Sequence, residues 1–450
     1  NNIMKKTIYI FLILILFATS FFTYKIVSGK YDKQDQFILK FKEIVPTELK
    51  NKLRGSIYSL RANINKDQNE RIQQKKLKQG LNGDLIQSEI IKSEVESKKF
   101  IVSEFFLPFE RLDLDYGWRA IKNSKRAHYL DIVDDKTIVV SGEGEFIYFE
   151  TKNFNSNKLN QKIIDSNLEQ LIEKKNYKLI GLRDLLIDGD ELYVSVILQN
   201  KNEDYTISIL STKFNINKLE FEFFFNTDIN LKKYSIGTGG RIVKFKDNKL
   251  LFSIGHFSVP NKVQELEYLA GKIISIDKLN KNYQIVSLGH RNQQGLFYHQ
   301  DKKGKQFILN SEHGPKGGDE ININYLENEK LYNFGWPIAS YGINYDGTNP
   351  FKSSHKDYGF DEPLKYFTPS IGISEISIID NNEDFNTIFA SSLRAHSIYL
   401  LKTNKKFTKV FNTDRLELDY RIRDLKYVES LDGHIVIFEN IPSIGFIKNK

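Results

Sequence analysis

From Ile101 onward, the sequence consists of short apolar runs separated by polar turns. Paired runs such as Thr137–Val140 with Glu145–Phe149, or Ile242–Phe245 with Lys249–Ile254, are joined by short polar segments that are typical of β-hairpins. Many short strands of even spacing over about 350 residues restrict the fold to a β-propeller or a large β-sandwich. No clean internal repeat separates these two folds.

The composition supports a large core. Hydrophobic residues make up 40% of the chain, which includes 33 Phe and 23 Tyr. The formal net charge is +8, but Lys and Arg are interleaved with acidic residues along most of the chain. This dispersed charge favours a solvated basic surface over nucleic-acid binding, and no nucleic-acid partner is expected. Cysteine is absent, which excludes disulfides and thiolate metal sites.

Residues 1–30 carry a targeting pattern. Lys5 and Lys6 precede the apolar run Thr7–Phe17, which is the order of an export signal. The apolar character continues to Val27, close to the ~20 residues that span a bilayer, while small residues near Ser20 offer a cleavage site. We expect either a cleaved signal peptide or a transmembrane anchor. Both would place the rest of the chain in the periplasm or at the outer face of the membrane.

Residues 31–99 differ from the rest in pattern. Apolar side chains recur three and four residues apart, as on one face of an amphipathic helix, at Leu49, Leu53, Ile57, Leu60 and Ile64. Ile86, Ile90 and Ile91 indicate a second short helix. We therefore expect a polar helical spacer before a domain over residues 100–450. An oligomeric stalk that carries an adhesion or scaffold domain is an alternative.

The stretch Ser287–Pro337 is the richest in glycine and polar residues that can bind ligands. Its first turn, GHRN at residues 289–292, presents a planar cation beside a neutral amide, which suits carboxylate or quinone oxygens. Its second turn, EHGPKGGDE at residues 312–320, exposes backbone carbonyls of the kind that calcium binds. Each turn alone is a weak signal, but the two occur in order and close together.

In sequence order, GHRNQQG, SEHGPKGGDEIN and NFGWP form a signature that resembles the soluble quinoprotein glucose/sorbosone and aldose sugar dehydrogenases. The resemblance covers about residues 101–447. It implies an all-β, six-bladed β-propeller that uses pyrroloquinoline quinone (PQQ) and calcium. The implied function is an exported or membrane-anchored oxidoreductase that oxidises an aldose or related sugar and passes the electrons to an acceptor that the sequence does not identify.

The resemblance also assigns roles to individual residues. It assigns cofactor binding to Arg291, Asn292, Arg394, Arg421 and Arg423. Side chains two apart on a strand point to the same face, as the R-x-R pair at 421 and 423 would require, and we expect all five residues to converge in one pocket. The main-chain carbonyls of Gly314 and Pro315 are expected to bind calcium, and Asp319 is expected to line the site.

One departure from the family pattern concerns the general base. The family has a histidine four residues before Arg241, where this chain has Gly237. His256, which stands where the family has an acid, is the candidate replacement because a histidine with a pKa near 6.5 is a competent base. Water, His313 or Asp319 are the other candidates. If none of them acts, the chain is an inactive extracytoplasmic propeller that binds a sugar or a protein partner.

Overall fold

The computed structural model describes residues 85–93, 100–109, 125–156, 158–232, 237–301, 304–328, 330–379, 385–439 and 442–449. The predicted signal or anchor over residues 1–30 and the amphipathic helix over residues 49–64 lie outside these ranges. Within these ranges, no helix has both the length and the apolar character needed to cross a membrane. The described residues belong to one compact unit, Leu81–Lys450.

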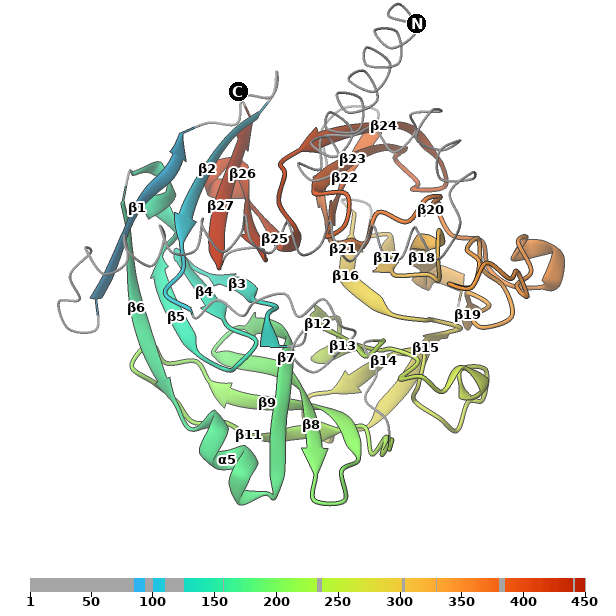
Figure 1. Ribbon diagram of the computed structural model, residues 1–450, viewed down its shortest axis with the longest axis horizontal. Coiled ribbons are helices and arrows are strands. Elements are labelled where there is room, and N and C mark those ends of the chain that lie inside the picture. Colours follow the sequence, from blue (N-terminus) through green and yellow to red (C-terminus); the bar gives the residue numbers. More distant parts are fainter. Residues whose placement is uncertain are drawn as a thin grey trace, which may run out of the picture. The chain divides into compact units, whose positions relative to one another are not determined.

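The described residues form six antiparallel blades arranged in a ring (Figure 1). The first blade consists of β3 (Tyr129–Val133), β4 (Lys136–Val140), β5 (Phe146–Glu150) and β6 (Lys158–Ser166), and the second of β7 (Tyr177–Asp188), β8 (Glu191–Asn200), β9 (Tyr205–Lys213) and β11 (Glu222–Asn226). The third blade consists of β12 (Gly239–Phe245), β13 (Lys249–Ile254), β14 (Lys272–Asp277) and β15 (Tyr283–Leu288), and the fourth of β16 (Gln293–Gln300), β17 (Gln306–Glu312), β18 (Asp319–Tyr325) and β20 (Lys365–Phe367). The fifth blade consists of β21 (Ile373–Ile379), β22 (Phe385–Ser392), β23 (Ser397–Asn404) and β24 (Val410–Glu417), and the sixth of β25 (Ile422–Val428), β26 (Gly433–Phe438), β27 (Ser443–Asn449) and β2 (Phe100–Phe106). The fold is therefore an all-β, six-bladed propeller.

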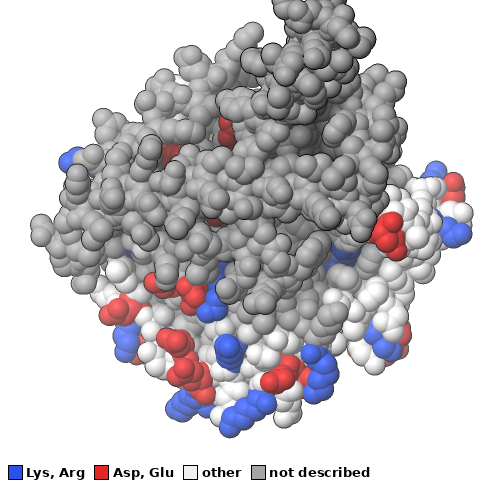
Figure 2. Space-filling view, in the orientation of Figure 1, with Lys and Arg blue, Asp and Glu red and all other residues white. Residues whose placement is uncertain are grey.

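The remaining elements are short and lie between or beside the blades. They are β1 (Leu85–Ser93), β10 (Lys218–Leu219), β19 (Tyr332–Asn333), the helix α5 (Leu168–Lys174), and five 3-10 turns at Thr151–Asn155, Pro260–Lys262, Leu326–Asn328, Lys356–Tyr358 and Glu429–Leu431. Over the described surface visible in Figure 2, basic and acidic side chains are interspersed.

The ring closes through its first and last strands. β2 pairs along its whole length with β27, so the last blade is completed by a strand from the N-terminal side. β1 then pairs with β2 and with β6, which joins the last blade to the first. The second short helix predicted around Ile86–Ile91 was therefore wrong. These residues are strand, because pairing with two edge strands outweighs a local helical pattern.

The core lies between the blades. Six hydrophobic clusters of buried residues each join two neighbouring blades around the ring. The middle strands are therefore buried on both faces, as in β8, where Leu192–Leu198 are all buried. In strands that are buried on both faces, apolar residues follow one another without alternating with polar residues. This is why no repeat stands out in the sequence.

The innermost strands meet at the axis of the ring around one buried arginine. Arg241 on β12 lies 3.0 Å from Asp184 on β7, 3.1 Å from Glu375 on β21 and 3.2 Å from Asp424 on β25. Backbone N–H groups of β3 and β16 donate to Asp424 and Glu375. The innermost strands of all six blades thus contact this axial cluster, defined as Arg241, Asp184, Glu375 and Asp424.

Candidate active site

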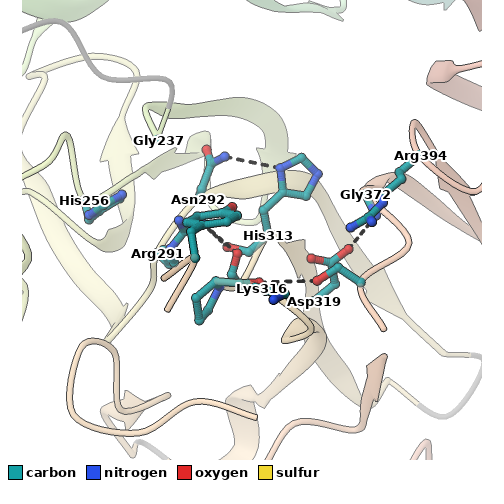
Figure 3. A pocket seen from close by; sticks show the side chains of 13 residues that line it. Gly237, His256, Arg291, Asn292, His313, Lys316, Asp319, Gly372 and Arg394 are labelled. Carbon is teal, nitrogen blue, oxygen red and sulfur yellow. Dashed lines mark hydrogen bonds between the residues drawn. The ribbon is translucent and has the colours of Figure 1, made fainter. Parts of the chain in front are cut away.

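A cavity of about 160 Å³ lies at one end of the third, fourth and fifth blades (Figure 3). The loops that follow β13, β15, β17, β19, β20 and β22 supply most of its lining. The lining residues are Gly237, His256, Arg291, Asn292, His313, Gly314, Pro315, Lys316, Asp319, Tyr345, Ser370, Gly372 and Arg394. The two turns that stood out in the sequence therefore border the same cavity, because they lie at the same ends of adjacent strands.

The backbone of the second turn is tightly folded at Gly314. A Cβ at this position would lie 1.7 Å from the carbonyl oxygen of Gly318, so only glycine fits. The turn is also held from outside, since the amide of Gly317 donates to Ser370 Oγ (2.9 Å) and the Thr368 hydroxyl donates to the carbonyl of Gly317 (2.6 Å). These contacts hold the backbone of the turn in place.

Arg291 is held at both ends. Its backbone N–H donates to Glu312 Oε2 (2.7 Å), and its guanidinium lies 5.2 Å from the centre of the Trp336 ring. Nη1 donates to the carbonyls of His313 (3.0 Å) and Gly314 (2.7 Å). The Gly314 carbonyl therefore accepts from a cationic group, and it takes no part in strand pairing.

The Pro315 carbonyl is also outside a strand ladder. It accepts long hydrogen bonds from Ser370 Oγ (3.3 Å) and from the amide of Gly318 (3.4 Å). Among the described residues, no group of three or more His, Asp or Glu side chains could hold a metal ion. The carbonyls of Gly314 and Pro315 are oxygens of the kind that bind a hard cation, and the Gly314 carbonyl accepts from Arg291 in this arrangement.

Asn292 and Asp319 are fixed by hydrogen bonds within the site. The Asn292 side-chain carbonyl accepts from Gln294 Nε2 (3.0 Å) and from the amide of Gly239 (3.3 Å), and its amide nitrogen lies 3.4 Å from His313 Nδ1. Asp319 Oδ2 accepts from the amides of Gly372 (2.6 Å) and Ile373 (3.0 Å). Asp319 thus ties the fourth blade to the fifth at the cavity.

His256 lies at the edge of the cavity, as Figure 3 shows. Its ring stands edge-on to Trp336, and its backbone N–H donates to the carbonyl of Arg291 (2.8 Å). Burial, and then the nearby Arg291 charge, lower the pKa of His256 to about 3. The sequence-based assumption of a pKa near 6.5 was wrong, because the sequence does not show how deeply the ring is buried.

His313, like His256, is half-buried. Burial lowers its pKa as well, although Asp319 opposes this effect. Its Nε2 has no hydrogen-bond partner among the described residues. Both histidines near the cavity are therefore neutral imidazoles at pH 7.

The structure brings Arg291, Asn292 and Arg394 together at the cavity, but Arg421 and Arg423 are not among its lining residues. That all five residues bind one cofactor stays a prediction. Both arginines instead bind Glu439, a buried carboxylate, through Arg421 Nε (2.9 Å) and Arg423 Nη2 (2.8 Å). No sequence pattern indicated Glu439, since it comes from the end of a different strand.

Arg421 and Arg423 remain connected to the cavity. Arg423 Nη1 donates to Gln294 Oε1 (2.9 Å), and Gln294 in turn donates to Asn292. Arg421 Nη1 donates to the carbonyl of Leu393 (3.3 Å), the residue before Arg394.

Several lining residues were missed by reasoning from the sequence. Lys316 lies within the EHGPKGGDE turn, which contained a signal. Trp336, which does not line the cavity but supports Arg291, lies within NFGWP. Tyr345 lies in the long segment between β19 and β20, where no sequence motif marks it, and it is 64% exposed at the cavity. Ser370 and Gly372 flank the start of β21.

Comparison with known proteins gives several similarities. Aldose sugar dehydrogenase YliI of Escherichia coli is 28% identical over 240 residues, which are 48% of this chain and 62% of that protein. An uncharacterised protein of Synechocystis is 28% identical over 225 residues, which are 44% of this chain and 52% of that protein. The matched part thus spans between about half and three fifths of these relatives.

Solved structures show the same fold. A glucose dehydrogenase superposes with a TM-score of 0.59 at 21% identity, and the match covers 73% of this chain and 97% of that one. The PQQ-bound aldose sugar dehydrogenase of Streptomyces coelicolor superposes with a TM-score of 0.51 at 17% identity, and the match covers 80% and 100%. The profile of the glucose/sorbosone dehydrogenase family matches residues 160–443, which are more than half of the chain. The chain therefore belongs to the glucose/sorbosone dehydrogenase family.

Proposed function

We propose that this chain is a PQQ-dependent oxidoreductase that oxidises an aldose or a related sugar. The observation that carries the proposal is that two sets of ligand-binding groups line the same cavity. Arg291, Asn292 and Arg394 offer cationic and amide donors for an anionic, carbonyl-rich ligand, and the carbonyls of Gly314 and Pro315 offer oxygens for a cation. Family membership supports the same reaction class.

The residues fit PQQ and calcium by their chemistry. The cavity lining carries three cationic side chains against one carboxylate, which suits a ligand that has three carboxylates. When bound, PQQ would accept hydride from the sugar, and calcium would polarise the quinone carbonyl. Arg291 and Arg394 would hold the ligand's anionic groups, Asn292 would donate to a ligand oxygen, and the two carbonyls would bind calcium.

His256 is the proposed acceptor of the sugar's hydroxyl proton. Its imidazole is neutral at pH 7 and lies at the cavity edge, whereas Gly237 has no side chain. A pKa of about 3 makes the imidazole a weak base, so we expect slow turnover. Asp319 is the second candidate, although one of its oxygens is already held by two backbone amides.

An inactive propeller that binds a sugar or a protein partner is the alternative. Two observations favour it: the absence of a side chain at Gly237 and the low pKa of His256. Both weaken proton abstraction while leaving the ligand-binding groups in place. The two proposals therefore differ in turnover, and a sugar could bind in either case.

One experiment tests both proposals. Purified full-length protein, freed of metal and cofactor, is titrated with PQQ in the presence and absence of Ca²⁺, and the absorbance of the bound cofactor is followed. A panel of aldoses is then added with a reducible dye. Saturable, calcium-dependent binding with dye reduction supports the oxidoreductase. Binding without reduction supports the alternative, and the absence of binding refutes the cofactor assignment.

We also propose that residues 1–30 export the propeller, either as a cleaved signal or as a membrane anchor. The support is the order of Lys5, Lys6 and the following apolar run. Cell fractionation and protease treatment of intact spheroplasts would test this. A propeller that stays protected in the cytoplasmic fraction would refute it.

A further inference from the structure

Glu312, the last residue of β17, is a buried carboxylate next to the lining of the cavity. Its side chain is 4% exposed and lies within reach of three donors. Oε2 accepts from the backbone N–H of Arg291 (2.7 Å), and Oε1 accepts from Asn322 Nδ2 (2.6 Å). Oε1 also lies 3.2 Å from His290 Nδ1. Glu312 therefore ties the turn that carries Arg291 to β18 of the fourth blade.

His290 extends these contacts to the third blade. Its Nε2 lies 2.8 Å from Ser287 Oγ on β15. Because a carboxylate oxygen only accepts, Nδ1 is the ring nitrogen that donates to Glu312, which leaves Nε2 to accept from the Ser287 hydroxyl. The three side chains have the order of a Ser–His–acid triad, but Ser287 and His290 are completely buried, so no substrate reaches the serine. Their contacts therefore orient Glu312.

A second buried carboxylate, Glu320 on β18, stands directly opposite Glu312 in the strand register. Burial raises the pKa of Glu320 well above its usual value, and the charge of Glu312 adds to this rise. The neutral form of Glu320 is favoured, because two adjacent buried charges of one sign repel each other. Of the two carboxylates, Glu312 is the one that receives the N–H of Arg291.

The backbone of Arg291 holds other parts of the site in turn. Its carbonyl accepts from the backbone N–H of His256 (2.8 Å), and the next carbonyl, of Asn292, accepts from the N–H of His313 (2.9 Å). The Arg291 guanidinium lies 5.2 Å from the centre of the Trp336 ring, and the His256 ring stands edge-on to the same indole. A shift of the Arg291 backbone would therefore move Arg291 and His256 together and uncover Trp336.

We propose that Glu312 is a positioning residue, held by His290, that acts through the backbone of Arg291 to place both the Arg291 guanidinium and the His256 imidazole at the cavity. The roles of Arg291 in binding PQQ and of His256 in accepting a proton rest on the proposed function. Their placement by Glu312 does not, so the experiment has one arm without cofactor and one arm with it.

The first arm measures acrylamide quenching of Trp336 fluorescence in full-length apo-protein. The chain has two tryptophans, and Trp118→Phe leaves Trp336 as the reporter in every variant. We expect Glu312→Gln to raise the quenching constant. Glutamine has one acceptor oxygen where the carboxylate has two, so its NH2 group would face either the Arg291 N–H or the donors of His290 and Asn322.

Asp188→Asn is the matched control for the loss of a buried carboxylate. Asp188 is 9% exposed and pairs with Lys244 (2.7 Å) and Lys278 (2.8 Å). Lys244 lies near the end of β12 that is farther from Gly237, and so away from the cavity. The control should give the quenching constant of the parent.

The second arm measures PQQ binding by absorbance and sugar turnover at saturating PQQ. We expect Glu312→Gln to raise the Kd for PQQ about tenfold or more, because Arg291 is displaced. We also expect kcat to fall at saturating PQQ, because His256 shifts with Arg291. A protein that is only less stable would keep its kcat below its melting temperature, and Asp188→Asn should keep both values.

His290 supplies a second pair of variants if Glu312→Gln does not fold. His290→Asn keeps an N–H donor close to the position of Nδ1 and should resemble the parent. His290→Leu removes the donor and should raise both the quenching constant and the Kd for PQQ. Equal values for these two variants would overturn the role of His290 in holding Glu312.

The outcomes separate this inference from the proposed function. Quenching, PQQ binding and kcat that are all unchanged in folded Glu312→Gln overturn the inference while the proposed function stands. Quenching that rises in Glu312→Gln but not in Asp188→Asn, in a protein whose parent does not bind PQQ, supports the positioning role and refutes the cofactor assignment. Equal changes in Glu312→Gln and Asp188→Asn show a general loss of packing and also overturn the inference.

Discussion

Replacing Glu375 with glutamine is expected to change how the stability of the propeller depends on pH. Glu375 belongs to the axial cluster, where Arg241 faces three carboxylates within 3.2 Å. Burial raises the pKa of Glu375 to about 8; Arg241 opposes the rise, and the charges of Asp424 and Asp184 add to it. At pH 7 this carboxyl therefore carries a proton in the folded protein, which glutamine cannot lose.

The size of the effect follows from the change in pKa on folding. The folded-state pKa lies above the usual value of 4.5, so the stability that this group contributes is complete below pH 4.5 and is lost as the pH rises through 8. A rise from 4.5 to about 8 corresponds to on the order of 5 kcal/mol. For a unit of this length, that is a change of about 6 °C in melting temperature.

The assay compares the melting temperatures of the parent and Glu375→Gln from pH 5 to pH 9 by scanning fluorimetry. The advantage of the parent over the variant should shrink across this range, because only the parent loses the proton. Glutamine keeps the side-chain oxygen that accepts the backbone N–H groups of Leu296 and Ile376. Glu417→Gln, at an exposed pair on β24, is the control. Parallel profiles for the parent and Glu375→Gln would refute the argument.

Three further predictions concern the candidate active site. Arg291→Lys should weaken PQQ binding about tenfold or more in an absorbance titration, because lysine lacks the planar guanidinium that donates to the His313 and Gly314 carbonyls through Nη1 and has further N–H groups for a ligand carboxylate; an unchanged Kd would argue against this role. Gly314→Ala should abolish stabilisation by CaCl2 in a melting assay, since its Cβ would lie 1.7 Å from Gly318 O. Gly347→Ala, whose Cβ meets nothing within 4 Å and strains only a φ of +96°, should keep that stabilisation. Calcium stabilisation that survives Gly314→Ala would count against the turn as the calcium site. His256→Ala should abolish sugar turnover and leave PQQ binding intact, and turnover equal to the parent's would make His256 structural.

Much of the site could be predicted from the sequence because its parts are close together along the chain. Arg291 and Asn292 precede β16, and the turn that contains Gly314 joins β17 to β18. Antiparallel neighbours bring such turns to the same end of one blade, so a short stretch of sequence is enough to place them together. The close approach at Gly314 likewise requires glycine, which the sequence shows directly.

Only the tertiary structure decided the rest, because ring closure brings together residues that are far apart in the sequence. Arg126 comes from the start of the first blade and Glu439 from the last, and they meet because β2 pairs with β27 and completes the ring. The same closure turned residues 85–93 into a strand. The pKa of His256 was also decided by packing, since burial is a property of the neighbours that surround a side chain and no local pattern specifies them.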